Sequence, residues 1–303
     1  MSEIIIVAPF SVTYDGNDAD KHIISARQLG ESIIGASNLY TATAHYCMFG
    51  TIPKGNYKKE LQCFAKPAKE KCFEYQVFIA AIASEYALHG EIYKDGLGFL
   101  FSRTIEAIRK IWLKPGDTIK VTEELVELMK EQSRNNTAIQ TVLANGLIKS
   151  NDNLASLHGK LIDTLPEIAG LTRSQGRMLV SPVGNTCTSI TQFSETDEKI
   201  LITEAEAEVI RGGDEMEVDE MQQFICKRIK EVNELNGHCI LEIDGFDELI
   251  IGKIGDPALE SPNNVYTKAL NNHSQFTISA KPVLKNGLLH KLFISDAREL
   301  SMR

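Results

Sequence analysis

The sequence has no apolar run that approaches the length of about 18 residues expected of a membrane-spanning helix. Its first apolar segment, residues 4–10, is short and follows no basic residue, so it predicts a buried strand rather than a signal peptide. Six cysteines without a secretory signal are expected to be reduced thiols. We therefore expect a cytoplasmic protein without a membrane partner.

The sequence motifs of common enzymes are also missing. There is no G-x-S-x-G motif, no H-E-x-x-H motif and no G-x-G-x-x-G in a dinucleotide-binding context, and the seven histidines show no ligand spacing. One group of acidic residues has the chemistry to hold a metal, although turns and barrel rims carry such acids routinely: Asp244, Asp247, Glu248 and Asp256. We assign no catalytic residue, metal ligand or cofactor. A metal-dependent hydrolase stays a third alternative, because catalytic residues can lie far apart in a sequence.

A chain-wide excess of basic residues, typical of proteins that bind duplex nucleic acid, is absent. The formal net charge is −9, and residues 195–221 account for all of it with 11 acidic and 2 basic side chains. Such a stretch is typical of a solvated linker or an exposed element. We expect a linker here, and a contact surface is the alternative.

Residues 30–37, GESIIGAS, match the phosphate-binding pattern G-x-x-x-x-G-K-[ST] except that Ala36 replaces the lysine. Ser25 fits the first position of a capping box, and apolar residues then recur at helical spacing. The helix therefore begins before Gly30, whereas the glycines of a P-loop precede their helix. We predict that Gly30 and Gly35 lie inside the helix and allow close packing against a sheet, and that no nucleotide binds there.

The order of elements predicts an α+β protein, with an N-terminal α+β module, a long helical segment and a small C-terminal OB-like β-barrel. We place the boundaries at 1–118 for the first module, 119–176 for the helical segment, 177–221 for a β-containing connector with the acidic linker, and 222–303 for the barrel. The predicted strands before the barrel are 3–14, 59–66, 71–78, 178–183, 186–193 and 199–202. The predicted helices are 25–48, 79–89 and 97–113, followed by mostly helical structure over 122–170.

A row of residues with coiled-coil spacing runs through the helical segment: Leu147, Asn151, Leu154, His158, Leu161, Leu165 and Ile168. One interpretation packs this row against the protein's own first module. The other makes it an interface with a protein partner or a second copy, in which the polar members fix the register. Residues 139–168 are therefore the first candidate for an interface.

Residues 222–303 are predicted to form three strands, a short helix and two further strands. The turn signals Asn236–Gly237, Asp244–Gly245 and Asn286–Gly287 separate strands in this module. This order resembles that of an oligonucleotide/oligosaccharide-binding (OB) barrel. The resemblance implies a fold whose members often bind single-stranded nucleic acid or oligosaccharide through one face.

Binding of single-stranded nucleic acid needs a basic groove with stacking aromatic rings. The candidate cations are Lys227, Arg228, Lys230, Lys253 and Lys281. The aromatic residues fit an inward alternation and are predicted to be core: Phe224, Phe276 and Phe293. Equal numbers of basic and acidic residues in the module also disfavour phosphate binding. We expect a non-enzymatic binding or regulatory protein that acts through protein contacts in an assembly, with single-stranded nucleic-acid binding as the alternative.

Overall fold

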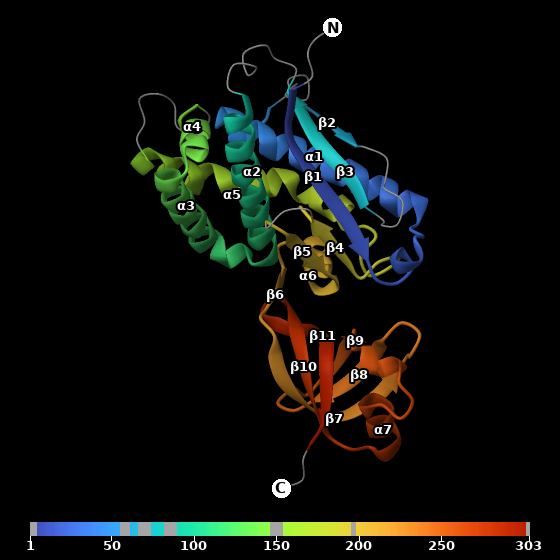
Figure 1. The fold of residues 1–303 in the computed structure, drawn as a ribbon. Coiled ribbons are helices and arrows are strands. Elements are labelled where there is room, and N and C mark those ends of the chain that lie inside the picture. Colours follow the sequence, from blue (N-terminus) through green and yellow to red (C-terminus); the bar gives the residue numbers. More distant parts are fainter. Residues whose placement is uncertain are drawn as a thin grey trace. The chain divides into compact units, whose positions relative to one another are not determined.

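The computed structural model describes residues 5–54, 61–65, 74–81, 90–145, 154–194 and 198–300. The chain divides into two compact units, unit 1 (Met1–Arg211) and unit 2 (Gly212–Arg303). Helices dominate unit 1 and strands dominate unit 2, which confirms the predicted α+β class with a C-terminal barrel (Figure 1). Within the described ranges, no helix combines the length and apolar character that a membrane crossing requires.

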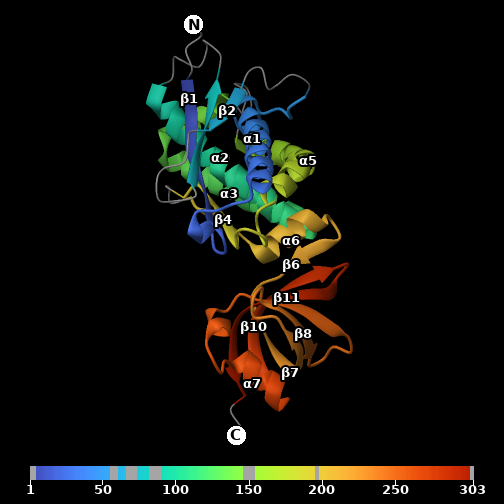
Figure 2. The same cartoon turned by 90° about the vertical axis from the view of Figure 1, so that its right-hand side faces the viewer.

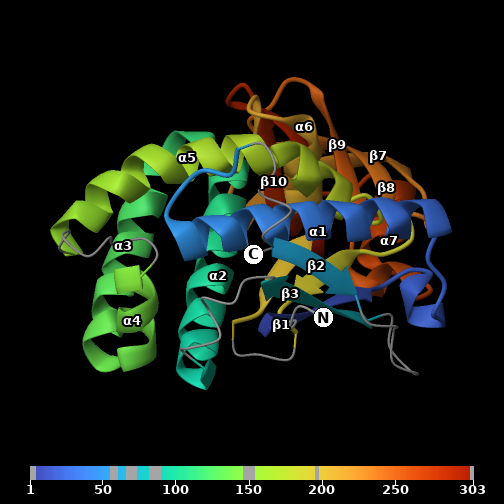
Figure 3. The same ribbon diagram turned by 90° about the horizontal axis from the view of Figure 1, so that it is seen from above.

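Unit 1 contains a five-stranded antiparallel sheet with the strand order β2-β3-β1-β4-β5. Its elements are β1 (Ile5–Asp15), α1 (Ala26–Phe49), β2 (Leu61–Ala65), β3 (Glu74–Ala81), α2 (Gly90–Leu113), α3 (Thr118–Asn135), α4 (Thr137–Asn145), α5 (Leu154–Leu179), β4 (Ser189–Gln192), β5 (Ile200–Thr203) and α6 (Glu204–Gly212). Helix α1 contacts β2 and β3 on one side and α5 on the other, and Figure 3 shows α1 between α5 and these strands. The predicted hairpin is the β2–β3 pair.

Helix α1 begins after Ser25, as predicted, and contains both glycines of the GESIIGAS stretch. A Cβ atom at Gly35 would lie 2.4 Å from the backbone N of Leu179 and 2.6 Å from the carbonyl O of Gln175, whereas one at Gly30 would meet nothing within 4 Å. Gly35 therefore allows close packing against α5. The predicted packing partner, a sheet, was wrong, because α5 lies on this side of α1.

Three predicted elements of unit 1 need correction. The predicted helix over 79–89 begins inside β3, and 82–89 lies outside the described residues. The predicted strand over 178–183 is instead the end of α5 and a turn, and the predicted strand over 186–193 contains only the short β4. Short apolar runs fit a strand or a buried helix equally well, and here the periodicity of α5 continues to Leu179.

The acidic stretch 195–221 is not a linker in its described part, because it contains β5, α6 and β6 (Met216–Val218). Strands β4 and β5 complete the sheet of unit 1, and the helical segment packs on α1 and α2 in the same unit. Helix α6 is fixed by Glu206, which accepts a hydrogen bond from the backbone N of Thr203 (3.2 Å) and pairs with Arg109 (3.0 Å). The predicted boundaries at 118/119 and 176/177 therefore fall inside one compact unit.

Unit 2 is a closed five-stranded barrel in the predicted order of elements (Figure 2). Its elements are β7 (Gln222–Val232), β8 (His238–Ile243), β9 (Leu249–Ile254), α7 (Val265–Asn272), β10 (Phe276–Lys285) and β11 (Leu288–Glu299). The strands follow the order β11-β9-β8-β7-β10, the β10–β11 pair closes the barrel, and only the β9–β11 pair is parallel. Strand β6 extends the sheet beside β10, so the module begins before residue 222.

The barrel core follows from alternation along the strands. Cys239, Leu241 and Ile243 of β8 point inward and are fully buried. Tyr266 of α7 covers this core, and its ring meets Phe276 edge-to-face with centroids 6.0 Å apart. The side chains that remain on the outside of the barrel are the ones available to a ligand or partner.

Candidate functional site

The helical row predicted as an interface lies partly outside the described structure. Leu147 and Asn151 fall outside the described residues. Leu154 and His158 belong to the first turns of α5, whose side chains are not among those described. An interface role for these four residues stays a prediction.

Leu161 and Leu165 are fully buried inside unit 1, together with Ile168. Helix α5 packs against α1 and α3, and the hydroxyl groups of Tyr46 on α1 and Thr164 on α5 form a 2.6 Å hydrogen bond beside this row. The apolar spacing is thus satisfied within the chain. The structure corrects the interface assignment of Leu161 and Leu165 and favours the alternative, packing against the protein's own first module.

Three candidate cations of the barrel, Lys227, Arg228 and Lys230, contact acidic or imidazole side chains. Lys227 Nζ lies 2.8 Å from Asp244 Oδ1, and Lys230 Nζ lies 3.1 Å from Glu242 Oε2. The hydrogen bond from Lys227 lowers the pKa of Asp244 from its usual value. Arg228 contacts His273, the residue that follows α7: Arg228 Nη2 lies 3.2 Å from His273 Nδ1. These exposed pairs are weak, but they reduce the positive charge offered to a phosphate chain.

The other two candidates, Lys253 and Lys281, flank Phe293. In the strand register Phe293 of β11 lies beside Lys253 of β9 and Lys281 of β10. Lys291 Nζ lies 4.8 Å from the centroid of the Phe293 ring. The core assignment of Phe293 was therefore wrong: its neighbours Leu292 and Ile294 point inward and are buried, while Phe293 is half-buried on the outside. We call Lys253, Phe293, Lys281 and Lys291 the basic-aromatic patch.

A second outward surface, on β8 and β9, is apolar in the middle and charged at its ends. Ile240 and Ile251 are register partners, and Ile251 is 43% exposed. At one end His238 pairs with Lys253, and at the other Glu242 pairs with Leu249, which is 55% exposed. We call these six residues the β8–β9 face. The sequence signal for this face is the run of apolar residues at both outward and inward positions of β9, which we did not assign to a surface from the sequence.

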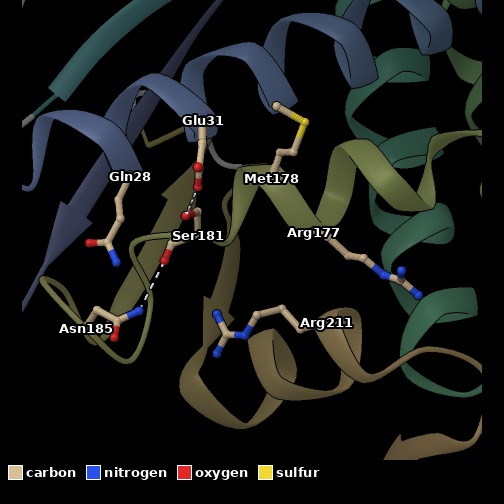
Figure 4. Close-up of a pocket in the computed structure, with 7 residues that line it drawn as sticks. All are labelled: Gln28, Glu31, Arg177, Met178, Ser181, Asn185 and Arg211. Carbon is tan, nitrogen blue, oxygen red and sulfur yellow. Dashed lines mark hydrogen bonds between the residues drawn. The ribbon is translucent and has the colours of Figure 1, made fainter.

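A pocket of ≈ 480 Å³ in unit 1 was not indicated by any motif. It is lined by Gln28 and Glu31 of α1, Arg177 and Met178 of α5, Ser181 and Asn185 of the following turn, and Arg211 of α6 (Figure 4). The lining residues come from segments up to 183 positions apart in the chain. Single-sequence spacing carries no signal for such a set.

No group of three or more His, Cys, Asp or Glu side chains among the described residues is arranged to hold a metal ion. Two of the acids singled out by the sequence have structural partners: Asp244 pairs with Lys227, and Asp256 accepts hydrogen bonds from Ala258 N (2.8 Å) and Tyr266 OH (2.8 Å). The hydrolase alternative gains no support from these positions.

The described cysteines are free thiols whose surroundings oppose ionisation. Burial raises the pKa of Cys63 to about 11 and that of four further thiols to about 12: Cys47, Cys187, Cys226 and Cys239. A nucleophilic or metal-binding thiol needs a lowered pKa, so these groups behave as small apolar side chains.

Comparison with known proteins identifies two families. The model of the family described as "Domain of unknown function (DUF7946)" matches residues 10–211, and that of the "Family of unknown function (DUF7947)" matches residues 221–298. No curated protein and no solved structure matches the chain. The two matched ranges correspond closely to unit 1 and unit 2.

Proposed function

This chain belongs to the family DUF7946 through residues 10–211. We propose that it is a non-enzymatic binding protein that acts through protein–protein contacts. The partner of the β8–β9 face is a second copy of the same chain. A regulatory role and a cytoplasmic location complete the proposal. The location is supported by the free thiols, because disulfides are rare in reducing compartments.

The observation that carries the proposal is the exposed apolar centre of the β8–β9 face. Ile251 and Leu249 keep about half of their surface exposed on a strand whose inward residues already fill the core. Contiguous exposed apolar surface rimmed by polar groups is typical of protein interaction sites. Burial of each such side chain stabilises an interface by about 1.5–3 kcal/mol at most, against association costs of about 4–15 kcal/mol, so several must contribute together.

The charge pattern of the same face favours a second copy over an unrelated protein. Lys253 places a positive charge at one end, and Glu242, whose carboxylate also pairs with Lys230, places a negative charge at the other. The required two-fold axis lies in the plane of the interface, runs across the strands and passes over the Ile240–Ile251 pair. Rotation about this axis would place the positive end of one copy on the negative end of the other. A closed symmetric dimer requires such a self-complementary surface.

Charge exchange gives a sharp test of this arrangement. Light scattering during size-exclusion chromatography of the 303-residue protein, at tens of micromolar, should report a dimer for the wild type. Glu242→Lys and Lys253→Glu should each give a monomer, because each places like charges opposite one another. The double variant exchanges the two ends and should restore the dimer.

The controls separate dimer loss from unfolding. Ile251→Asp should give a folded monomer, while Ile119→Asp, on a more exposed isoleucine of α3, should leave the dimer intact. A monomeric wild type would overturn the self-association. A double charge variant that stays monomeric would overturn the proposed face even if the wild type is a dimer.

The basic-aromatic patch favours one second candidate, binding of single-stranded nucleic acid. An outward aromatic ring with lysines beside it on adjacent strands is the kind of surface on which a base stacks and a phosphate chain is neutralised. Fluorescence anisotropy with a labelled oligothymidine at low salt tests it. Binding that weakens with salt and is lost in Phe293→Ala would favour this candidate; no binding would remove it.

A further inference from the structure

We propose that the unit 1 pocket binds the oxyanion group, a carboxylate or a phosphate, of a small molecule, and that Arg211 and Gln28 hold it. The inference uses residues of unit 1 only, so it does not depend on the proposed dimer. It rests on three properties of the pocket: a fixed arginine, spare hydrogen-bond donors on Arg211 and Gln28, and a suitable volume.

Arg211 is held in place by backbone groups. Its Nη1 donates to the carbonyl oxygens of Val180 (2.9 Å) and Val183 (3.1 Å), in the turn that follows α5. Within the described part of the chain it forms no ion pair. Its Nε and Nη2 therefore keep donors for a ligand, and the planar guanidinium can present two of them to one oxyanion.

Neighbouring carboxylates offset part of the charge of Arg211 but form no ion pair with it in the described part of the chain. Burial lowers the pKa of Arg211 from its usual value even though the residue is exposed at the pocket surface, while the carboxylates of Glu208 and Glu204 raise it. An arginine side chain remains protonated under such opposing influences. The pocket therefore contains a fixed positive charge that a ligand anion can approach.

The pocket keeps donors, although not every acceptor is used, because Asn185 donates its amide nitrogen to Ser181 O (3.4 Å) and keeps its amide oxygen as an acceptor. Both carboxylate oxygens of Glu31 accept hydrogen bonds, one from Ser181 Oγ (2.6 Å) and one from Arg27 Nε (3.1 Å). Those bonds lower the pKa of Glu31, Ser181 having the larger effect. The amide oxygen of Gln28 accepts from Thr186 Oγ1 (3.1 Å), which leaves its nitrogen to donate. A pocket with spare donors complements a group that only accepts, and an oxyanion is such a group.

The arrangement in Figure 4 places Gln28 and Arg211 around the same space. Their polar ends lie on either side of Ser181 and Asn185, whereas the guanidinium of Arg177 turns away from the others. Arg177 is therefore a rim residue rather than a direct contact. The volume of ≈ 480 Å³ falls in the usual range of about 300–1,000 Å³ for small-molecule sites, so a molecule larger than the bare ion fits.

Nuclear magnetic resonance on the full chain tests the site with the simplest probes. Inorganic phosphate or acetate is titrated at constant ionic strength, with chloride as the reference anion. We expect saturable shifts of the Arg211 Nε–H and Gln28 side-chain amide signals. The anion that gives the lower dissociation constant identifies the oxyanion that the site prefers.

Two variants and a matched control assign the shifts. Arg211→Gln should weaken binding about tenfold or more, because it removes the positive charge and the charge-assisted hydrogen bonds of the guanidinium. Gln28→Ala should weaken binding without touching the carbonyl contacts of Arg211, and it replaces Arg211→Gln if that variant unfolds. Arg134→Gln removes one exposed arginine that does not line the pocket and should change nothing. The proposal is overturned if neither anion gives a saturable shift, or if binding survives unchanged in Gln28→Ala and in a folded Arg211→Gln.

Discussion

The two glycines of α1 provide a matched pair of substitutions with opposite expected signs. Alanine favours a helix interior over glycine by about 1 kcal/mol. Gly30→Ala should gain this amount, because its new Cβ atom meets nothing within 4 Å. Gly35→Ala gains the same helical term but places a Cβ atom 2.4–2.8 Å from Leu179 N, Gln175 O and Met178 Cβ, at least about 0.6 Å short of the 3.4 Å of ordinary contact.

The clash at Gly35 should exceed the helical gain. Two of the three opposing atoms belong to the backbone of α5 and cannot rotate away, so α1 and α5 must separate. Overpacking of this kind costs about 1–3 kcal/mol, occasionally more. With the helical gain of about 1 kcal/mol subtracted, we expect Gly35→Ala to lower the free energy of unfolding of unit 1 by up to about 2 kcal/mol. For a domain of this size each kcal/mol shifts the midpoint temperature by about 2–4 °C.

Tryptophan fluorescence during urea unfolding isolates this effect. Trp112 is the only tryptophan in the sequence, it belongs to unit 1, and its Nε1 donates to Ala169 O (2.7 Å). Its signal therefore reports unit 1 without a contribution from the barrel. If Gly35→Ala stabilised unit 1 as much as Gly30→Ala, the contact between α1 and α5 described above would be incorrect.

Three further outcomes follow from other contacts. Arg109→Ala should destabilise unit 1 by about 3 kcal/mol in the same assay, because it leaves the nearly buried Glu206 without its 3.0 Å partner; a loss below 0.5 kcal/mol would contradict this. In the native protein, Ellman's reagent at pH 8 should leave the four thiols whose pKa is about 12 unmodified. After denaturation it should modify all six cysteines. Rapid labelling of Cys187 or Cys226 in the native protein would refute their burial. The bonds from Ser181 and Arg27 lower the pKa of Glu31, so they stabilise the fold above its usual pKa of 4.5 and this stabilisation is lost as pH falls through the lower folded pKa. The free energies of unfolding of wild type and Glu31→Gln should therefore differ at pH 6 and converge progressively as pH falls below 4.5; a difference that stays constant with pH would exclude this linkage.

The barrel could be predicted from the sequence because its signals are local. The Asn-Gly and Asp-Gly turns, the alternation Cys239-Leu241-Ile243 and the order of strands and helix all lie within one contiguous stretch. The direction of Phe293 could not be predicted in the same way. A one-residue change of register reverses the direction of every side chain on a strand, and the irregularity of the β10–β11 pairing at Val283/Leu284 lies between Phe293 and the nearest turn.

In unit 1 the sequence determined that helices form, because the 3.6-residue period is a property of neighbouring residues. Helix α1 begins after Ser25 as predicted, but Ser25 forms no side-chain cap hydrogen bond, so the predicted capping box is not what starts it. Only the tertiary structure decided what covers each apolar face. Leu161 and Leu165 have the spacing of an intermolecular seam, yet α5 buries both within its own unit. The same limit applies to the pocket, because Gln28, Ser181 and Arg211 meet only after three separate segments pack together. A periodic pattern indicates that a face must be covered, but it does not indicate which segment covers it.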